Sequence, residues 1–327
     1  MQSKPLISVI VPTFNRLKST LEAVACIDAQ TWRPLELLVI DDGSTDGSTD
    51  QLQEMLHNRN SSGVETVFVR QQNQGPGAAR NAGILRARGG FLAFLDSDDA
   101  WSEEKLARQM EVLAKFPESG ACFTDTLCIN CEGETVRALQ KFGGVYPAIS
   151  GIVPDAHLRQ ARSFCGYFIS ALLLRAHVAR SIELFDPAIS FSEDRDYCFR
   201  LSLVTQFSCL NEVLTHSDRS PSPVGSILRP WDRADVRLAG MQRMYEKWLS
   251  LPDPLPPALS MIIRQQLRSV HSQWSNQHLM CRSYKQARHA SMRALQYSFS
   301  APAFLKWALI CSLPGFAARL VRQREQG

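Results

Sequence analysis

Phe91–Asp99 reads FLAFLDSDD, an apolar run of five residues followed by three carboxylates within four positions. The apolar half predicts a buried strand of a parallel sheet. Open α/β sheets bind ligands beyond the carboxyl ends of such strands. Three like charges at that edge need a cation or hydrogen-bond donors to balance them. Oxygen ligands on a short turn suit Mg²⁺ or Mn²⁺, which often share their coordination with substrate phosphates. The stretch therefore predicts a diphosphate substrate.

Strands and helices alternate along the first 130 residues. Apolar and β-branched runs predict strands at Leu6–Val11, Leu35–Ile40, Val64–Val69, Phe91–Leu95 and Gly120–Ile129. Helical spacing of apolar residues predicts helices at Arg16–Gln30, Thr49–Leu56, Gly77–Ala87 and Glu103–Phe116. Pro12 is expected to close the first strand. This alternation predicts right-handed crossovers and a mostly parallel α/β sheet.

The regular pattern fades in the second part of the chain. Residues 139–165 are mixed and punctuated by Gly and Pro, as in a variable insertion. A strand at Ile169–Leu174 and a helix at Asp194–Thr205 follow, and the turn-rich stretch Ser217–Gly225 closes the domain. Helical patterns dominate from Asp232 onward. We therefore expect one domain over residues 1–225 and a basic helical region over residues 226–327.

Charge is unevenly distributed along the chain. The 327 residues carry a formal net charge of +4. Residues 261–327 hold ten of the 36 Lys and Arg and one acid, Glu325, so this tail carries +9 and residues 1–260 carry −5. A basic tail on an acidic body favours an anionic surface as partner, either a membrane or a nucleic acid. Nucleic acid is not expected, because no recognition motif accompanies the charge.

Cysteine usage and the apolar segments favour a reducing cytoplasm. Nine cysteines, an odd number without regular spacing, argue against a disulfide framework. Cys128 and Cys131 have CxxC spacing, but no second pair with zinc-like spacing accompanies them. Met1–Pro5 has no signal-peptide pattern, and no apolar run is long enough for a spanning helix.

Four polar loops follow the predicted strands at one edge of the sheet. They read PTFNR at 12–16, DDGSTD at 41–46, NQGPGAARN at 73–81 and DSDD at 96–99. In order and spacing these motifs resemble family 2 glycosyltransferases, which are inverting, nucleotide-sugar-dependent enzymes of the GT-A fold. The resemblance covers roughly residues 6–220. It implies a Rossmann-like sheet flanked by helices, with a nucleotide-sugar half at about 1–130 and an acceptor half at about 131–225.

The first two loops would bind the nucleotide in such an enzyme. The resemblance puts Pro12, Thr13 and Asn15 beside the donor, where the Thr13 hydroxyl suits a flat base. Asp41 would accept hydrogen bonds from a uracil-like imide N–H or from ribose hydroxyls. Its neighbours Asp42, Ser44 and Thr45 are also the residue types that cap a following helix.

The third loop carries a candidate phosphate or carboxylate partner. A Gly-Pro-Gly turn that opens a helix favours anions, and Arg80 lies one turn into that helix. Its guanidinium can meet a phosphate of the donor or form an ion pair with a loop carboxylate. The resemblance puts this segment beside the nucleotide, where it would brace the acidic loop.

The fourth loop would hold the metal ion, Mg²⁺ or Mn²⁺. The family pattern gives Asp98 the metal and places Asp96 at the ribose or in the metal shell, while Asp99 would support them or cap the next helix. The ion would bridge both phosphates and neutralise charge on the departing nucleoside diphosphate. His216, expected on a loop, is a further candidate, although a lone loop histidine is more often a surface residue.

Inversion also needs a base that takes the acceptor's proton on the opposite face of the sugar. Residues 192–201 read SEDRDYCFRL and resemble the family's ED segment at the start of a helix. Matching makes Asp194 the base, Glu193 its neighbour and Arg200 the helix arginine. The other interpretation is that Glu193 and Asp194 only stabilise the N-terminus of the helix, where negative charges are favourable. Ile182–Leu184 departs from the pattern, because the family often has glycine there.

The resemblance thus implies transfer of a sugar from a nucleotide-sugar to a hydroxyl of a glycan or lipid-linked acceptor in envelope or exopolysaccharide synthesis. We expect a UDP-sugar as donor, although Asp41 alone does not exclude GDP- or dTDP-sugars. The apolar tail Ala301–Val321 predicts an interfacial helix on the inner face of the plasma membrane. A helix docked on the core or at a dimer contact is the other interpretation.

Two other classes of protein are weighed against this function. A nucleotidyltransferase on a similar fold predicts a triphosphate loop rich in glycine and basic residues after the first strand, and PTFNR has no glycine. An inactive nucleotide-sugar-binding assembly protein predicts a lost base or metal carboxylate. Asp98 and Asp194 are both present.

Overall fold

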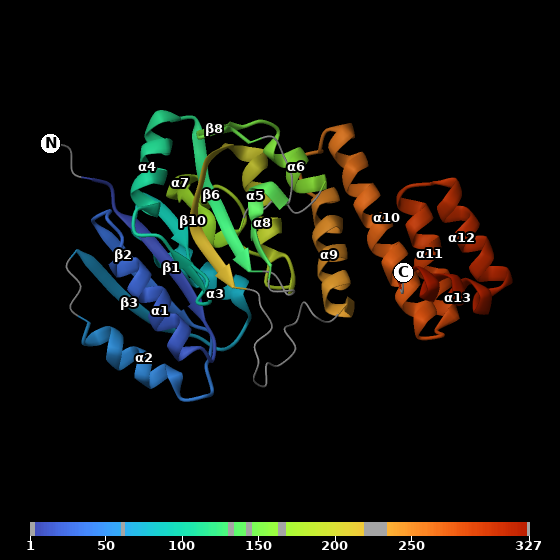
Figure 1. The fold of residues 1–327 in the computed structure, drawn as a ribbon, viewed down its shortest axis with the longest axis horizontal. Helices are drawn as coiled ribbons and strands as arrows, with labels where there is room; N and C mark the ends of the chain where they lie inside the picture. Colours follow the sequence, from blue (N-terminus) through green and yellow to red (C-terminus); the bar gives the residue numbers. More distant parts are fainter. Residues whose placement is uncertain are drawn as a thin grey trace. The chain divides into compact units, whose positions relative to one another are not determined.

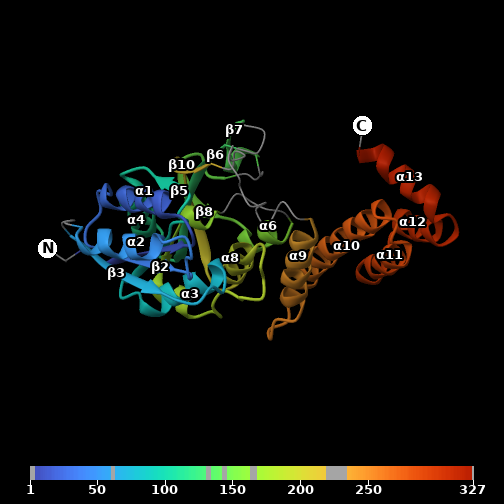
Figure 2. The same cartoon turned by 90° about the horizontal axis from the view of Figure 1, so that it is seen from below.

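The computed structural model describes residues 4–59, 63–129, 134–141, 146–162, 168–218 and 234–325. The chain clusters into two compact units, residues 1–188 with 193–225 and residues 189–192 with 226–327. In the described ranges the first unit contains both strands and helices, whereas the second contains helices (Figures 1 and 2). We propose residues 1–225 and 226–327 as the two domains.

A mixed sheet forms the centre of the first unit. Its strands are β1 (Ile7–Thr13), β2 (Leu35–Asp41), β3 (Val64–Arg70), β4 (Phe91–Phe94), β5 (Asp99–Trp101), β6 (Ser119–Ile129), β7 (Thr135–Arg137), β8 (Ser150–Val153), β9 (Leu172–Arg175) and β10 (Gln206–Asp218). Their order is β3-β2-β1-β4-β9-β6-β10-β5, with β7 beside β6 and β8 beside β10. The pairs among β3, β2, β1 and β4 are parallel, which confirms the predicted parallel sheet in this half.

Alternate residues of the central strands face opposite sides of the sheet and build two cores. In β1, Ile10 belongs to one core, whereas Val9 and Val11 belong to the other. The Ile10 side is covered by α3 (Pro76–Arg86), α5 (Ala138–Lys141), α6 (Ala156–Arg162), α7 (Ala176–Arg180) and α8 (Glu193–Val204). The Val9 side is covered by α1 (Leu17–Asp28), α2 (Ser48–His57) and α4 (Lys105–Lys115) (Figure 2).

Helix α3 comes very close to β1 at Gly83. This glycine is buried, and a Cβ atom at its position would lie 2.4 Å from Cγ2 of Ile10. Arg80 lies one turn earlier on the same helix. The missing side chain therefore sets how near α3, and Arg80 with it, sits to the sheet.

The predicted end of the first strand is wrong by two residues. β1 continues through Pro12 to Thr13, in register with β2. On its other side β1 pairs with β4, which ends at Phe94 opposite Ile10. Pro12 therefore has no partner in β4 that would need a backbone N–H from it. A proline is tolerated where its missing N–H has no ladder partner.

Two further details differ from the predicted elements. The predicted strand at 169–174 begins as a 3₁₀ turn, η1 (Ile169–Ala171), before β9. Asp99 does not cap a helix, because it opens β5, which pairs antiparallel with β10. Local sequence pattern does not reveal such long-range strand pairing.

The described part of the second unit consists mainly of helices, as predicted for the C-terminal region. Its helices are α9 (Ala234–Leu249), α10 (Pro257–Met280), α11 (Tyr284–Tyr297), α12 (Ala301–Ser312) and α13 (Pro314–Glu325). Leu279, Ala287 and Ile310 pack together in a small core with Ala317 and Ala318. None of the helices in the described ranges combines the length and apolar character needed to cross a bilayer.

One lysine is completely buried in the first unit. The ammonium of Lys105 donates to Oε1 of Gln109 at 2.9 Å and lies 4.0 Å from the ring centre of Trp101. Its burial lowers the pKa of Lys105 to about 7. The pKa of this lysine in the unfolded chain is near 10.5. Between pH 10.5 and 7 the unfolded chain therefore carries a proton on Lys105 that the folded protein lacks, so the stability falls as the pH drops through this range.

We expect Lys105→Met to stabilise the protein at pH 7 by about 1–4 kcal/mol, because a buried charge is replaced by an apolar chain of similar volume. The difference in unfolding free energy from the native protein should shrink between pH 7 and pH 10. Urea unfolding at both pH values measures it. Lys115→Met, on the exposed end of the same helix, is the control, and equal effects of the two changes would contradict the assignment.

Candidate active site

The candidate loops meet at one edge of the sheet. Parallel pairing sets Thr13 opposite Asp41 and Asp41 opposite Arg70, so three strand ends lie in a row. On the other side of β1, β4 ends at Phe94, just before the acidic turn at 96–99. Ligands of open α/β sheets bind at this edge.

The first two loops are bonded to each other through Asn15. This residue has a left-handed φ of 54°. Its backbone N–H donates to Oγ of Ser44 at 2.8 Å, and its side-chain oxygen accepts from the N–H of Thr45 at 2.8 Å. Thr13 is buried, with its hydroxyl 2.6 Å from that of Thr20. Nucleotide contacts by Thr13 and Asn15 stay predictions.

Asp41 and Asp42 both bind donors of the loops themselves. The fully buried Asp41 accepts from the N–H of Ser44 at 3.0 Å and from the hydroxyl of Thr49 at 2.6 Å. Asp42 accepts from the N–H of Gly75 at 2.7 Å and so braces the loop before α3. The predicted nucleobase contact of Asp41 remains a prediction.

The capping alternative for Asp42, Ser44 and Thr45 is wrong. α2 begins at Ser48, its N-cap is Gly47, and no side chain caps it. The three residues bond between neighbouring loops instead, because these loops lie side by side at the strand ends.

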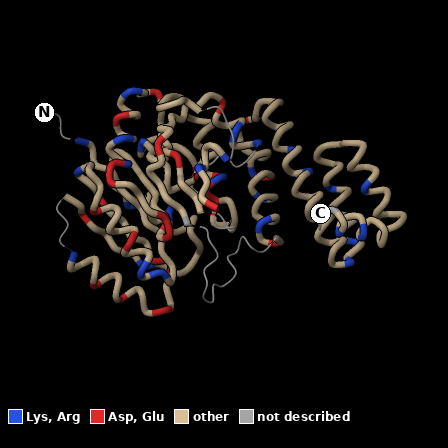
Figure 3. Tube along the Cα trace, in the orientation of Figure 1, with Lys and Arg blue, Asp and Glu red and all other residues tan. Residues whose placement is uncertain are grey.

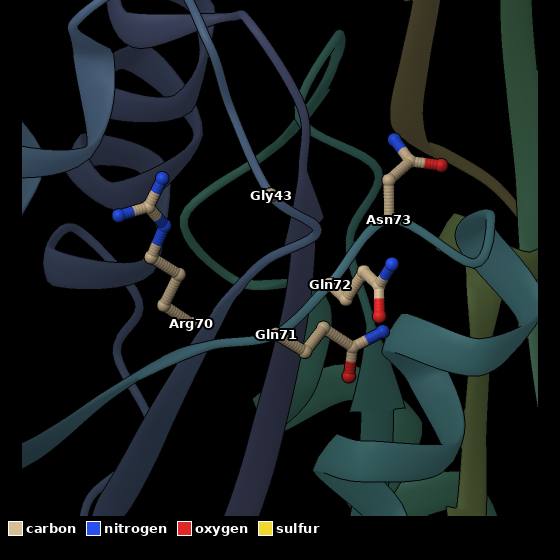
Figure 4. A pocket seen from close by; sticks show the side chains of 5 residues that line it. All are labelled: Gly43, Arg70, Gln71, Gln72 and Asn73. Atoms are coloured by element: carbon tan, nitrogen blue, oxygen red, sulfur yellow. The ribbon is translucent and has the colours of Figure 1, made fainter.

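An open hollow of about 560 Å³ lies beside these carboxylates. Figure 4 shows the residues that line it, which are Gly43, Arg70, Gln71, Gln72 and Asn73. Nε of Arg70 lies 3.8 Å from the carboxylate of Asp41. None of the lining residues is among the predicted site residues. Arg70 ends β3 at the ligand-binding edge, and that position is the sequence signal that finds it.

Arg80 is the centre of the site. Its guanidinium donates to Asp96 at 2.7 Å and to Glu193 at 2.8 Å, and its side chain is only 4% exposed. These two carboxylates raise the pKa of the arginine further, against the effect of burial. Of the two predicted roles, the structure shows the ion pair with loop carboxylates.

Asn81 fixes the segment that leads into α8. Its side chain donates to the carbonyl oxygen of Phe185 at 2.8 Å and accepts from the N–H of Phe185 at 2.9 Å. A Cβ at Gly77 would lie 3.3 Å from Cβ of Phe185 and 3.5 Å from Cγ of Glu193. The third loop and the ED segment are therefore in contact, which the chain order does not reveal.

Asp194 lies in the first turn of α8, next to Glu193 and half-buried. Loss of hydration, followed by the charge of Glu193, raises the pKa of Asp194 to about 6, although Arg80 opposes the shift. A carboxylate with this pKa is ionised at neutral pH and accepts a proton more readily than an ordinary aspartate. Its role as base stays a prediction.

The acidic turn is held by Ser170 on one side and pairs with a more exposed arginine on the other. Oγ of Ser170 donates to Asp99 at 2.6 Å and accepts from the N–H of Asp96 at 3.1 Å. Asp99 is thus a structural residue. Asp98 instead pairs with Arg16 at 2.8 Å, with side chains that are 22% and 40% exposed.

The remaining candidates take no part in the contacts described above. His216 is on β10, opposite Ala100, and not on a loop as predicted, because the strand extends to Asp218. Arg200 pairs with Asp196 at 2.8 Å within α8. Cys128 is buried, and Cys131 lies outside the described residues.

Comparison with known proteins identifies the family. The model of glycosyl transferase family 2 matches residues 8–173, which is half of the chain. The chain belongs to this family. An uncharacterized glycosyltransferase of Nostoc sp. is 33% identical over 184 residues, 55% of this chain and 54% of that protein. The putative teichuronic acid biosynthesis glycosyltransferase TuaG of Bacillus subtilis is 37% identical over 110 residues, 34% of this chain and 42% of that protein. This family 2 chain thus spans about half the length of these curated relatives.

Solved structures show the same fold. S. aureus TarS 1-349 has a TM-score of 0.65 at 19% identity, over 98% of this chain and 91% of that one. The mannosyltransferase PcManGT of Pyrobaculum calidifontis has a TM-score of 0.53 at 16% identity, over 95% and 81%. The predicted family and GT-A fold are confirmed.

A divalent metal fits the acidic turn best together with a substrate that completes its ligands. In the described part of this family 2 chain, no three His, Cys, Asp or Glu side chains are grouped to hold an ion. Asp96 and Asp98 are 21% and 22% exposed on one turn. One or two carboxylates completed by phosphates and water are the usual ligands of Mg²⁺. The donor set therefore fits an ion that binds with a diphosphate.

We expect Arg80→Met to destabilise the first unit by about 3–5 kcal/mol, because Asp96 and Glu193 lose the charge that balances them. Chemical denaturation measures the loss. Arg86→Met, exposed on the same helix, removes an equal charge and should cost little. Equal losses in the two variants would show that Arg80 does not hold the site together.

Proposed function

We propose that the protein is an inverting glycosyltransferase that moves a sugar from a UDP-sugar to a hydroxyl acceptor in envelope or exopolysaccharide glycan synthesis. The observation that carries the proposal is Arg80, which bonds both Asp96 of the acidic turn and Glu193 of α8. A donor-side carboxylate and the neighbour of the candidate base Asp194, far apart in the chain, thereby belong to one site.

The names of similar proteins support this choice of substrates. TarS 1-349 is known in complex with UDP and with UDP-GlcNAc, and PcManGT with GDP-Man and Mn²⁺. TuaG is named for teichuronic acid biosynthesis, which favours a cell-envelope glycan as product. We choose UDP over GDP because TarS has the higher TM-score and the wider coverage.

In the proposed reaction Asp194 takes the proton of the acceptor hydroxyl. The acceptor oxygen then forms a bond to the anomeric carbon, from the face opposite the nucleotide. The bond between that carbon and the phosphate oxygen breaks, and its electron pair leaves with the nucleoside diphosphate. The attack from the opposite face inverts the configuration of the sugar carbon.

The donor side of the site must stabilise the departing diphosphate. Asp98, with Asp96, would hold Mg²⁺ or Mn²⁺, which supplies neutralisation of the charge on the leaving group. Arg80 keeps Asp96 and Glu193 at fixed distances from its guanidinium, so the donor side and the base keep their relative positions. Such fixed orientation contributes to rate by limiting misplaced geometries.

We expect Asp194→Asn to lower kcat for transfer by about 10²–10⁴-fold, since the amide cannot accept the proton. In the native protein kcat should rise with pH and level off above about 6, where Asp194 is ionised. Asp98→Asn should instead weaken binding of the donor with Mn²⁺. Steady-state kinetics of UDP-GlcNAc hydrolysis with Mn²⁺, in which water takes the place of the acceptor hydroxyl and UDP release is monitored, measures all three effects.

Asp50→Asn, on the exposed face of α2, removes one carboxylate outside the site and should leave the kinetics unchanged. Unchanged turnover in both Asp98→Asn and Asp194→Asn would contradict the mechanism.

We propose that the second unit contacts an anionic membrane on its cytoplasmic face. A lipid-linked acceptor would lie in that membrane. From Pro254 to Arg324 the sequence has ten Lys and Arg and no Asp or Glu. Figure 3 shows these cations along α10 to α13. Six large apolar side chains are 40–71% exposed around α12 and α13, namely Phe299, Phe304, Leu305, Leu313, Phe316 and Leu320. Exposed aromatic groups with flanking cations are typical of interfacial helices.

We expect the protein to sediment with vesicles containing phosphatidylglycerol, less at high salt, and not with vesicles of phosphatidylcholine alone. Phe304→Ser with Phe316→Ser should lower the bound fraction several-fold, since each buried aromatic contributes apolar area. Leu85→Ser, at an isolated position that is 71% exposed, is the control. No sedimentation with anionic vesicles would contradict the contact.

A further inference from the structure

The acidic turn carries two arginine–carboxylate pairs of different character. Arg80 is 4% exposed and pairs with Asp96 inside the site. Arg16 is 40% exposed and pairs with Asp98 at 2.8 Å on the open side of the turn. Buried pairs are costly to break, whereas exposed ones contribute little and exchange easily. The pair at Asp98 is therefore the one that a ligand can displace.

Arg16 has a fixed backbone and a movable side chain. Its carbonyl oxygen accepts from the N–H of Thr20 at 3.0 Å in the first turn of α1. The preceding Asn15 is held by Ser44 and Thr45 of the neighbouring loop. The guanidinium reaches from this anchored loop to the turn after β4, and its exposed position leaves room for rotation about the side-chain bonds.

We propose that Arg16 is an exchangeable counter-ion of the donor site, an inference that rests on the proposed function. In the donor-free protein its guanidinium neutralises Asp98 and competes with a divalent ion for the same carboxylate. When the ion binds with the diphosphate, the ion takes Asp98 and the guanidinium turns to the diphosphate oxygens. An arginine fork matches phosphate oxygens in charge and geometry.

This exchange has opposite effects on two ligands. Arg16 weakens binding of the ion alone, because the ion must first displace the guanidinium. It strengthens binding of the diphosphate with the ion, because the displaced guanidinium gains a new anionic partner. The site therefore favours ion and donor together over the ion alone more strongly than a pair of carboxylates without Arg16 would.

The test compares Arg16→Gln with Lys18→Gln. Lys18 lies on the same helix, is 92% exposed, and is 3.9 Å from Glu22. The change Lys18→Gln thus removes the same charge without touching Asp98. Mn²⁺ binding is measured by electron paramagnetic resonance of the free ion, and UDP binding by isothermal titration calorimetry with saturating Mn²⁺.

We expect Arg16→Gln to tighten Mn²⁺ binding to the donor-free protein by about two- to fivefold, the range of an exposed ion pair. The same variant should weaken UDP binding in the presence of Mn²⁺ by a similar or larger factor. Lys18→Gln should leave the Mn²⁺ affinity and the UDP affinity close to those of the native protein, apart from the small effect of removing one positive charge. Arg16→Lys, which keeps the cation, should lie between the native protein and Arg16→Gln in both measurements.

Equal Mn²⁺ affinities of Arg16→Gln and Lys18→Gln would overturn the inference and leave the proposed function standing. Weaker binding of both Mn²⁺ and UDP in Arg16→Gln would also overturn it, because loss of an exchangeable counter-ion must tighten Mn²⁺ binding and weaken UDP binding. If the native protein bound neither Mn²⁺ with UDP nor UDP alone, the proposed function would fall, and the inference with it.

Discussion

The ion pairs of Arg80 are the interaction on which the rest of the site depends. Asp96 and Glu193 come from different parts of the chain, and mutual repulsion would separate them without a cation between them. Arginine suits this position because it keeps its proton and offers several donors in one plane. Its guanidinium also lies 5.5 Å from the ring centre of Phe185, in the segment that leads to α8. The pairs form only when α3, the turn after β4 and the start of α8 have all assumed their places.

The parallel sheet explains why a few contacts between the loops are enough to hold the site together. Because β1, β2, β3 and β4 run parallel, their polar ends come together without help from the loops. The loops then bond to one another, as Asn15 does with Thr45 and Asp42 with Gly75. The strands and the bonds between the loops therefore hold much of the geometry of the site.

Periodicity and motif order were enough to predict the strands of the parallel half of the sheet and the edge where the loops meet, but they did not predict β5, β7, β8 or β10. They were not enough for contacts between distant segments. The bond of Asn81 to Phe185 and the pair of Arg16 with Asp98 depend on tertiary packing, which no local pattern encodes. The same limit explains why helix capping, one of the two alternatives for Asp99, does not occur, since the pairing of β5 with β10 joins residues far apart in sequence. The position of Arg70 could have been found, because it ends a predicted strand at the ligand-binding edge.

Gly83 makes the site depend on the distance between α3 and the sheet as well as on charge. The helix that carries Arg80 lies against Ile10 with no room for a methyl group between them. Any larger residue would shift the helix outward and carry the guanidinium with it. A change that alters neither charge nor hydrogen-bonding groups would then act on both carboxylates at once. Tolerance to substitution in this protein is thus set partly by the spacing between α3 and the sheet.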